Sequence, residues 1–213
     1  MTPLRIAVVL AAALLLSAGL AAVMVLPGPD RRGAGSDPAA LPDLGQTPAW
    51  TLTDSNGDAF SSDDLRGSPY VIDFIFTRCK LACPMMTLHM KDVQDRLAQR
   101  GALGGVKLVS VSVDPEHDRP DVLAAFKQRY DAHREHWKFL TGESKDAVWS
   151  LVENGYLLPL DDTPENELMP IQHSTSFLLV DADGVIRGRY DSDDQAARER
   201  LTADAARLAQ PMP

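Results

Sequence analysis

Residues 74–90, "FIFTRCKLACPMMTLHM", hold the only two cysteines of this 213-residue chain, Cys79 and Cys83. The stretch opens on the end of an apolar run and continues with apolar residues at helical spacing, which predicts a strand followed by a helix. Pro84 stands where such a helix would begin, a position that tolerates proline. Two thiols at a strand-to-helix junction are consistent with a structural disulfide, a redox dithiol or half of a metal site.

Strands and helices alternate on both sides of this stretch. Residues 69–76 and 106–113 are mostly apolar without clean alternation, which is typical of strands buried on both faces. The helix over 84–99 carries four apolar residues at helical spacing, Met86, Met90, Val93 and Leu97. The other expected elements are a β-hairpin over 49–60 turning at Asn56-Gly57, a helical turn at 61–67, a helix over 119–130, a strand at 137–142, a helix over 144–155, a loop or exposed hairpin over 157–172, two strands over 174–191 joined at "DADG", and a helix over 194–209.

This order predicts an α/β domain with a thioredoxin-like fold, an N-terminal β-hairpin and an inserted loop or hairpin. We expect a sheet dominated by parallel pairs, with helices on both faces. Ligands of such sheets bind outside the carboxyl ends of the strands. Cys79 follows the strand at 70–76 and Asp114 follows the strand at 106–113, so both are expected at that edge.

The N-terminus predicts a membrane anchor. Residues 6–26 form an apolar run without charge, and a helix needs roughly 20 such residues to cross a bilayer. We therefore expect a single-pass anchor over 1–27, with a cleaved signal peptide as the alternative. Residues 28–47 are rich in Pro, Gly, Ala and Asp and predict a flexible tether, followed by the domain at 48–213. The expected location is the cytoplasmic (inner) membrane, with the domain in the periplasm.

The overall charge excludes one class of partner. The net charge of -9 and the pI of about 4.9 lack the basic footprint of a nucleic-acid-binding protein. An acidic surface is more consistent with solubility and with attraction to cations or basic partners.

The three readings of the cysteine pair differ in their physics. A disulfide closing so small a loop would stabilise weakly. A helix N-terminus lowers a thiol pKa, which favours redox chemistry, but redox motifs of this fold usually separate their cysteines by two residues and here three intervene. Residues at i and i+4 of a helical turn point the same way, so both sulfurs could bind one soft ion such as copper or zinc.

A metal site would need a third ligand, and five histidines are candidates. Three of them, His117, His133 and His136, lie in polar segments and are expected to face solvent. His89 lies on the predicted first helix as a surface residue or reserve ligand. His173 stands immediately before a buried strand, at the junction with the acidic insertion. The methionines near the cysteines are expected to fill the core rather than to bind metal.

Four segments in order resemble the Sco/SenC family of copper-binding assembly factors for cytochrome c oxidase. They are "FTRCKLACPMMTLHM", "SVDPEHDRPDVLAAF", "WKFLTG" and "QHSTSFLLVDADG", and the likeness extends over residues 48–206. The resemblance implies that copper is bound by Cys79, Cys83 and His173. It also implies a modulating role near the metal for Asp114, whose alternative role is to cap the turn through Pro115.

Two more charged residues lie within the segments that carry the resemblance. Asp118 is expected to be a cap or surface charge before the next helix. Lys80 lies in the interval "KLA", where many family members have Pro-Asp after the first cysteine, and its charge should favour the thiolate form.

The resemblance implies a membrane-anchored metallochaperone rather than an enzyme. Its cargo would be copper, as Cu(I), Cu(II) or both, taken from an upstream periplasmic donor and passed to the dinuclear copper site of cytochrome c oxidase subunit II. The alternative is a thiol-disulfide oxidoreductase in which Cys79 and Cys83 reduce the target cysteines. A thiol peroxidase on the same fold has no support in the sequence.

Overall fold

A computed structural model describes residues 41–133 and 135–210 of the chain. The predicted anchor at 1–27 and residues 28–40 of the predicted tether lie outside these residues. None of the helices described in this part of the chain combines the length and the apolar character needed to cross a membrane.

The described residues form the expected alternation of strands and helices. The strands are β1 (Thr51–Asp54), β2 (Ala59–Ser61), β3 (Tyr70–Ile75), β4 (Lys107–Ser112), β5 (Trp137–Thr141), β6 (Asp161–Asp162), β7 (Ile171–Gln172), β8 (Ser176–Val180) and β9 (Ile186–Asp191). The α-helices are α2 (Ala82–Gln99), α3 (Pro120–Arg129), α4 (Lys145–Ser150) and α5 (Gln195–Leu208). Short 3-10 helices cover Ser62–Leu65 and Leu103–Gly105, and a π-helical turn at Leu151–Gly155 continues α4.

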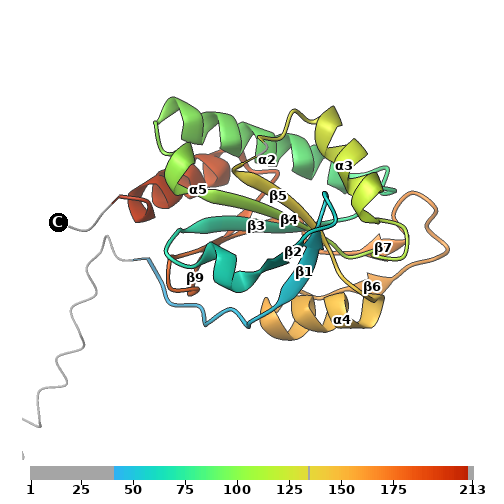
Figure 1. Ribbon diagram of the computed structural model, residues 1–213. Coiled ribbons are helices and arrows are strands. Elements are labelled where there is room, and N and C mark those ends of the chain that lie inside the picture. Colours follow the sequence, from blue (N-terminus) through green and yellow to red (C-terminus); the bar gives the residue numbers. More distant parts are fainter. Residues whose placement is uncertain (1–40, 134, 211–213) are drawn as a thin grey trace, which may run out of the picture. The chain divides into compact units, whose positions relative to one another are not determined.

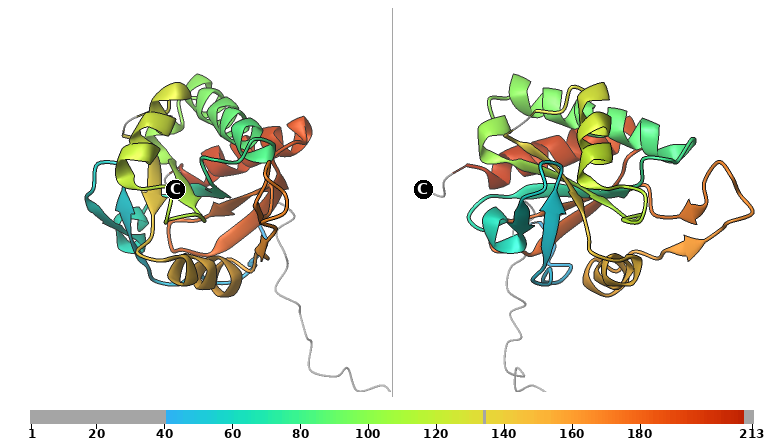
Figure 2. Two further views of the ribbon diagram at one scale, coloured as in Figure 1. Left: turned by 90° about the vertical axis from the view of Figure 1, so that its right-hand side faces the viewer. Right: turned by 45° about the vertical axis from the view of Figure 1, so that its right-hand side comes forward.

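A seven-stranded sheet in the order β2-β1-β5-β4-β3-β8-β9 forms the centre of the domain. Helices α2, α3 and α5 cover one face and α4 the other (Figures 1 and 2), as predicted. The expectation of mostly parallel pairing is wrong, because only β3–β4 and β4–β5 are parallel. The β1–β2 hairpin lies on one side of this parallel centre and the β8–β9 hairpin on the other. The two strands of each hairpin are joined by a short turn and therefore run antiparallel.

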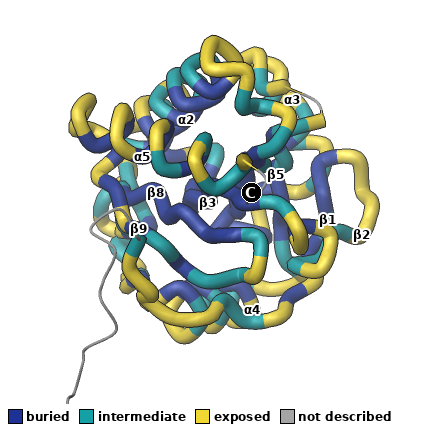
Figure 3. Tube along the Cα trace, turned by 90° about the vertical axis from the view of Figure 1, so that its left-hand side faces the viewer, coloured by how far each residue is buried: buried dark blue, intermediate teal, exposed yellow. Residues whose placement is uncertain are grey.

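The apolar patterns place the core where they predict it. Every residue of β3 is buried, and Figure 3 shows β3 and β8 as a buried centre beneath helices with exposed outer surfaces. The α2 residues Met86, Met90, Val93 and Leu97 are each 0% exposed. Burying side chains of this size stabilises a fold by about 1.5–3 kcal/mol each, so this stripe holds α2 on the sheet.

The segment before β1 joins the sheet through its backbone. The Leu44 N–H donates to the Ile186 carbonyl, and the Thr47 N–H donates to the Gly184 carbonyl, both at 2.9 Å. These bonds attach residues 44–47, which the sequence assigns to the tether, to the start of β9 and the turn before it.

The inserted segment is a two-stranded hairpin. Strands β6 and β7 pair with each other, with Asp161 opposite Gln172, and stand apart from the main sheet. The right-hand view of Figure 2 shows this hairpin projecting beside the N-terminal end of α2. The insertion therefore lies next to the cysteine segment.

A candidate thiol and metal site

The cysteine segment connects β3 to α2. Helix α2 begins at Ala82, two residues earlier than expected, so Cys83 lies in its first turn. Cys79 precedes the helix, so the expectation that both cysteines share one helical turn is wrong. Both thiols are free and buried, with exposed fractions of 4% for Cys79 and 0% for Cys83.

His173 reaches the cysteines from a distant part of the chain. It lies between β7 and β8, and β8 pairs with β3, which leads into the cysteine segment. The Nε2 atom of His173 is 3.1 Å from Sγ of Cys83. The His173 ring also packs edge-on against Phe76, with centroids 5.5 Å apart, and the residue is only 8% exposed. Of the five histidines, His173 is thus the one that contacts a cysteine.

The other ring nitrogen determines which tautomer His173 adopts. Its Nδ1 atom lies 3.0 Å from the Ser174 carbonyl oxygen. A carbonyl can only accept, so Nδ1 must carry the proton, and the Nε2 atom of the neutral ring keeps a free lone pair. That lone pair faces Cys83 and can accept the thiol proton or bind a metal ion.

The two cysteines differ in acidity. A hydrogen bond from Cys83 is the largest cause that holds the pKa of Cys79 well below that of an ordinary thiol. A contact with the His173 side chain and the backbone N–H groups of Cys83 and Leu81 add to it. Burial, followed by the nearby Cys79, raises the pKa of Cys83. Cys79 is therefore the thiolate of the pair and Cys83 the thiol. The backbone N–H groups at the start of the helix contribute to this, as predicted, but the side chain of Cys83 contributes more.

The chemistry of the donors suits a soft metal ion. Two sulfurs and an imidazole are the ligand types that copper and zinc prefer. Within the described ranges, no three His, Cys, Asp or Glu side chains are already spaced to hold a metal ion. The separation of 3.1 Å between Cys83 and His173 is that of a hydrogen-bonded pair. A sulfur and a nitrogen bound to one tetrahedral ion lie roughly 3.6 Å apart, so a metal would have to part them slightly.

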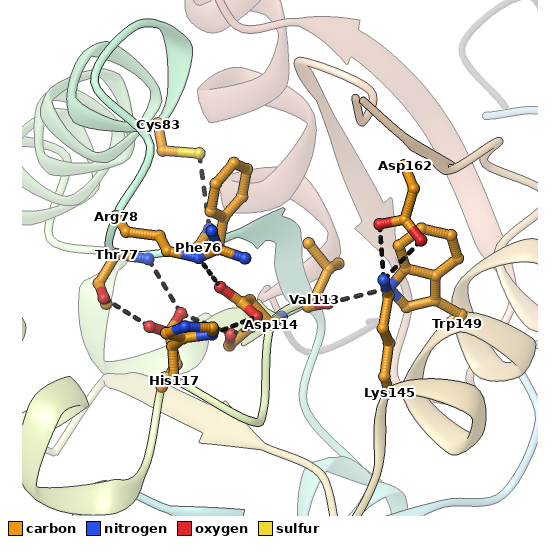
Figure 4. A network of polar contacts seen from close by, with 12 residues as sticks. Phe76, Thr77, Arg78, Cys83, Val113, Asp114, His117, Lys145, Trp149 and Asp162 are labelled. Atoms are coloured by element: carbon orange, nitrogen blue, oxygen red, sulfur yellow. Dashed lines mark hydrogen bonds and ion pairs between the residues drawn. The ribbon is translucent and has the colours of Figure 1, made fainter. Parts of the chain in front are cut away.

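Asp114 is linked to the site through the residue before Cys79. Its carboxylate pairs with Nε of Arg78 and lies 3.0 Å from Nδ1 of His117 (Figure 4). In the described part of the chain it has no hydrogen bond or ion pair with Cys79, Cys83 or His173. The turn after β4 is closed by the backbone, because the Asp118 N–H donates to the Asp114 carbonyl at 2.9 Å. The predicted alternative, a cap made by the Asp114 side chain, is not among its hydrogen bonds within the described residues, which go to Arg78 and His117.

Asp118 differs most from its prediction. It is 0% exposed, so the expectation of a cap or surface charge is wrong. Its Oδ2 accepts from the Thr77 N–H at 2.9 Å and from the Ser112 hydroxyl at 2.6 Å, and its Oδ1 accepts from the Thr77 hydroxyl at 2.5 Å. Burial raises its pKa. Asp118 therefore anchors the backbone two residues before Cys79, which spacing along the sequence could not reveal.

The sequence reasoning also missed Asp73, which lies in the middle of β3. It is 0% exposed, and neither carboxyl oxygen has a hydrogen-bond partner among the residues that the structure describes. Burial raises its pKa to about 7. The signal was visible in the sequence, since an acidic residue inside the buried strand "PYVIDFIF" has no ordinary packing role.

The other histidines lie in different surroundings. His117 and His133 are exposed as expected, whereas His136 is half-buried. The His133 and His136 rings lie 4.6 Å apart. The Nδ1 atom of His89 is 3.4 Å from Oδ1 of Asp193, so this residue of α2 faces the start of α5 rather than the cysteines.

A thioredoxin-like sheet with a thiol pair and a histidine at the carboxyl ends of its strands defines this protein as a thioredoxin-like thiol protein. The SCO1/SenC family model matches residues 41–210, and the chain belongs to the SCO1/SenC family. The chain is 33% identical over 155 residues to the SCO1 protein homolog of Bacillus subtilis, covering 73% of this chain and 78% of that relative. It is 30% identical over 146 residues to a SCO2-like protein of Rickettsia typhi, covering 64% of this chain and 65% of that one.

Solved structures share the fold. A SCO1/SenC family lipoprotein of Bacillus anthracis superposes with a TM-score of 0.74 at 30% identity, over 81% of this chain and 100% of that one. BsSco, described with a disulfide switch and as a cytochrome c oxidase assembly protein, superposes with a TM-score of 0.73 at 27% identity, over 81% and 99%. ScoI of Bradyrhizobium japonicum, solved with copper bound, has a TM-score of 0.65 at 24% identity, over 77% and 99%. Copper is therefore a metal that Sco homologues bind, as the prediction for this chain requires.

Proposed function

We propose that this protein is a membrane-anchored copper chaperone that helps assemble the dinuclear copper site of cytochrome c oxidase subunit II. Copper is the cargo, and Cys79, Cys83 and His173 are its ligands. Membership of the SCO1/SenC family and the copper-bound homologues support the metal. The role of BsSco in oxidase assembly supports the target.

One observation carries the proposal, the contact of 3.1 Å between Cys83 and His173. Thiol–disulfide exchange depends far less on a histidine whose free lone pair is directed at the second sulfur. A three-ligand metal site requires it, because the metal must displace the thiol proton and bind both atoms. Since the Ser174 carbonyl holds the proton on Nδ1, the ring presents Nε2 without a change of tautomer.

Three ligands leave a position open for exchange. The Cys79 thiolate is ready to bind, whereas Cys83 must first lose its proton when copper arrives. A thiolate of the target can enter at the open position, and the ligands of the chaperone then leave one at a time. Burial of the cysteines limits loss of the ion to water between these steps.

The test is the substitution His173→Ala in the full chain. We expect a large loss of copper affinity with little change in the rate of thiol–disulfide exchange on a model disulfide. Unchanged copper affinity would contradict the three-ligand site. Ser174→Ala serves as a matched control, because it keeps the backbone carbonyl that holds His173.

The second candidate is a thiol-disulfide oxidoreductase, and the unequal acidity of the two cysteines favours it. The Cys79 thiolate would attack a target disulfide, form a mixed disulfide and release one target thiolate. Cys83, after losing its proton, would attack the Cys79 sulfur and release the second target thiolate. The target gains two electrons, and the chain retains a Cys79–Cys83 disulfide. If His173→Ala kept copper delivery and lost only exchange, this candidate would replace the first.

We also propose that residues 1–27 anchor the protein in the inner membrane, with the domain in the periplasm and a periplasmic copper donor upstream. The apolar run at 6–26 supports the anchor. Protease added to cells with a permeabilised outer membrane should digest the domain. A domain that resists this protease until the inner membrane is also broken would contradict the location.

A further inference from the structure

The exposed apolar side chains of the domain gather around the cysteines. Six large apolar side chains are exposed in the part of the chain that the structure describes, namely Leu44, Leu81, Met85, Leu88, Leu157 and Leu168. Four of these six belong to two segments that meet at the site. We call Leu81, Met85, Leu88 and Leu168 the apolar patch.

Helix geometry places three members of the patch in one stripe. Leu81 precedes α2, and Met85 and Leu88 follow it at four and seven residues, which is the spacing of one helix face. The opposite face of α2 holds the buried Met86 and Met90. The stripe is therefore the outer surface of the first turns of α2, beginning between the two cysteines.

The acidic insertion supplies the fourth member. The N–H of Lys80 donates to the carbonyl of Leu168 at 2.9 Å, so the β6–β7 hairpin lies directly beside the cysteine segment. Leu168 is 47% exposed, close to the 48% of Leu81. Isolated apolar residues on a surface are ordinary, but a cluster at the mouth of a reactive site points to an interaction surface.

The surroundings of the patch are acidic on the side of the insertion, and Lys80 is an exposed cation beside Leu81. Residues 159–170 contain four acidic residues, Asp161, Asp162, Glu165 and Glu167, and no Lys or Arg. Of these, Asp162 pairs with Lys145, and the other three have no ion pair within the described residues. At the other end of the stripe, Asp193 lies beside His89, the residue after Leu88, and is 65% exposed. A partner that fits this surface must be apolar at its centre and basic where it faces the insertion and Asp193.

We propose that the apolar patch docks the protein that accepts copper from Cys79 and Cys83. This inference rests on the proposed function, because ligand exchange requires the thiolates of the acceptor to reach the same ion. The acceptor must then cover Leu81, which lies between the two cysteines. The occupant is a protein whose metal-binding thiols are surrounded by apolar and basic residues, and subunit II is the specific candidate.

The experiment compares two ways of removing copper from the full chain in detergent. The first probe is the reduced soluble copper domain of subunit II, which must dock. The second is a small Cu(I) chelator, which need not. The patch variant is Met85→Gln, Leu88→Gln and Leu168→Ser, chosen to keep the helix and to leave Leu81, whose N–H supports the Cys79 thiolate, unchanged. Leu44→Gln is the matched control, since Leu44 is 47% exposed and lies on the segment before β1.

We expect the patch variant to transfer copper to the subunit II domain roughly tenfold more slowly, with an unchanged rate to the chelator. The control variant should behave as wild type with both probes. Higher ionic strength should slow transfer to the protein and not to the chelator. Equal rates for patch variant and wild type, or equal slowing with both probes, would overturn the inference.

Two further outcomes separate this inference from the proposed function. If wild type transfers copper to the chelator and never to the subunit II domain, the proposed target is wrong and the docking inference falls with it. If sedimentation shows a wild-type dimer that the patch substitutions dissociate, the patch binds a second copy and the docking inference alone is overturned.

Discussion

Asp118 and Thr77 are 41 residues apart in the sequence and joined by two hydrogen bonds, from the Thr77 N–H at 2.9 Å and from its hydroxyl at 2.5 Å. Thr77 is two residues before Cys79. The Cys79 N–H in turn donates to the Phe76 carbonyl, and Cys83 Sγ accepts from the Phe76 N–H at 3.5 Å. The turn after β4 therefore holds the segment that carries the reactive thiol.

Replacing Asp118 should disturb that thiol. Asp118→Ala leaves the Thr77 N–H and the buried Ser112 hydroxyl without their acceptor, and we expect a loss of about 3 kcal/mol in the free energy of unfolding. The copper affinity and the alkylation rate of Cys79 should change as well. Asp118→Asn keeps one oxygen for Thr77 and should restore most of both properties.

The control for this substitution is Asp54→Ala in the β1–β2 hairpin. Asp54 is also buried and accepts from backbone N–H groups, those of Asn56 at 2.8 Å and Asp58 at 3.2 Å. The Asp54→Ala variant should lose a comparable free energy of unfolding, while the alkylation rate of Cys79 stays that of wild type. If both variants change the thiol equally, Asp118 acts through stability alone.

Removing Cys83 should make Cys79 less reactive. Because a hydrogen bond from Cys83 is the largest cause of its low pKa, Cys83→Ala should raise the pKa of Cys79 toward the ordinary thiol value of about 8.5. The alkylation rate of Cys79 at neutral pH should fall by roughly tenfold or more. In wild type the rate should stay high as the solution becomes acidic. A wild-type rate that falls below pH 8 in the manner of a free thiol would refute the assignment of Cys79 as the thiolate.

Asp73 should make the fold more stable in acid. The folded-state pKa is raised to about 7, whereas an unfolded aspartate titrates near 3.9. Between these values the unfolded chain loses a proton that the folded chain keeps. The free energy of unfolding should therefore fall as pH rises from about 4 to about 7 and stay level above.

Asp73→Asn removes that titration. Its free energy of unfolding should lack the loss over this window, which amounts to at most about 4 kcal/mol in wild type. Denaturant unfolding of both proteins at a series of pH values measures the difference. Parallel pH profiles for the two proteins would show that Asp73 titrates normally.

Leu157 occupies a backbone conformation that disfavours its side chain. Its φ is 55°, in the left-handed region, and the residue is 69% exposed, so packing offers little compensation. Leu157→Gly should stabilise the protein by about 1 kcal/mol. Leu158→Gly is the contrasting substitution. Leu158 is 2% exposed, so removing its side chain should lower the stability of the protein. A lower melting temperature for Leu157→Gly would contradict this expectation.

Local patterns determined most of the elements. The apolar spacing of Met86 and Met90 identified the helix after the cysteines, and the mostly apolar segment at 69–76 identified a central strand. Asn56-Gly57 marked the first hairpin, in which Gly57 has a φ of 90° that glycine adopts without strain. These signals depend on near neighbours in the chain, so the sequence contains them in full.

The sequence by itself also placed Cys79 and Cys83 at the carboxyl edge of the sheet, and the family resemblance singled out His173. Only the tertiary structure brought Cys83 and His173 to 3.1 Å and buried Asp118 beneath the cysteine segment. Both facts depend on how strands distant in sequence pair in space. A sequence shows that a carboxylate or an imidazole is present, but burial and hydrogen-bond partners decide its charge and its role.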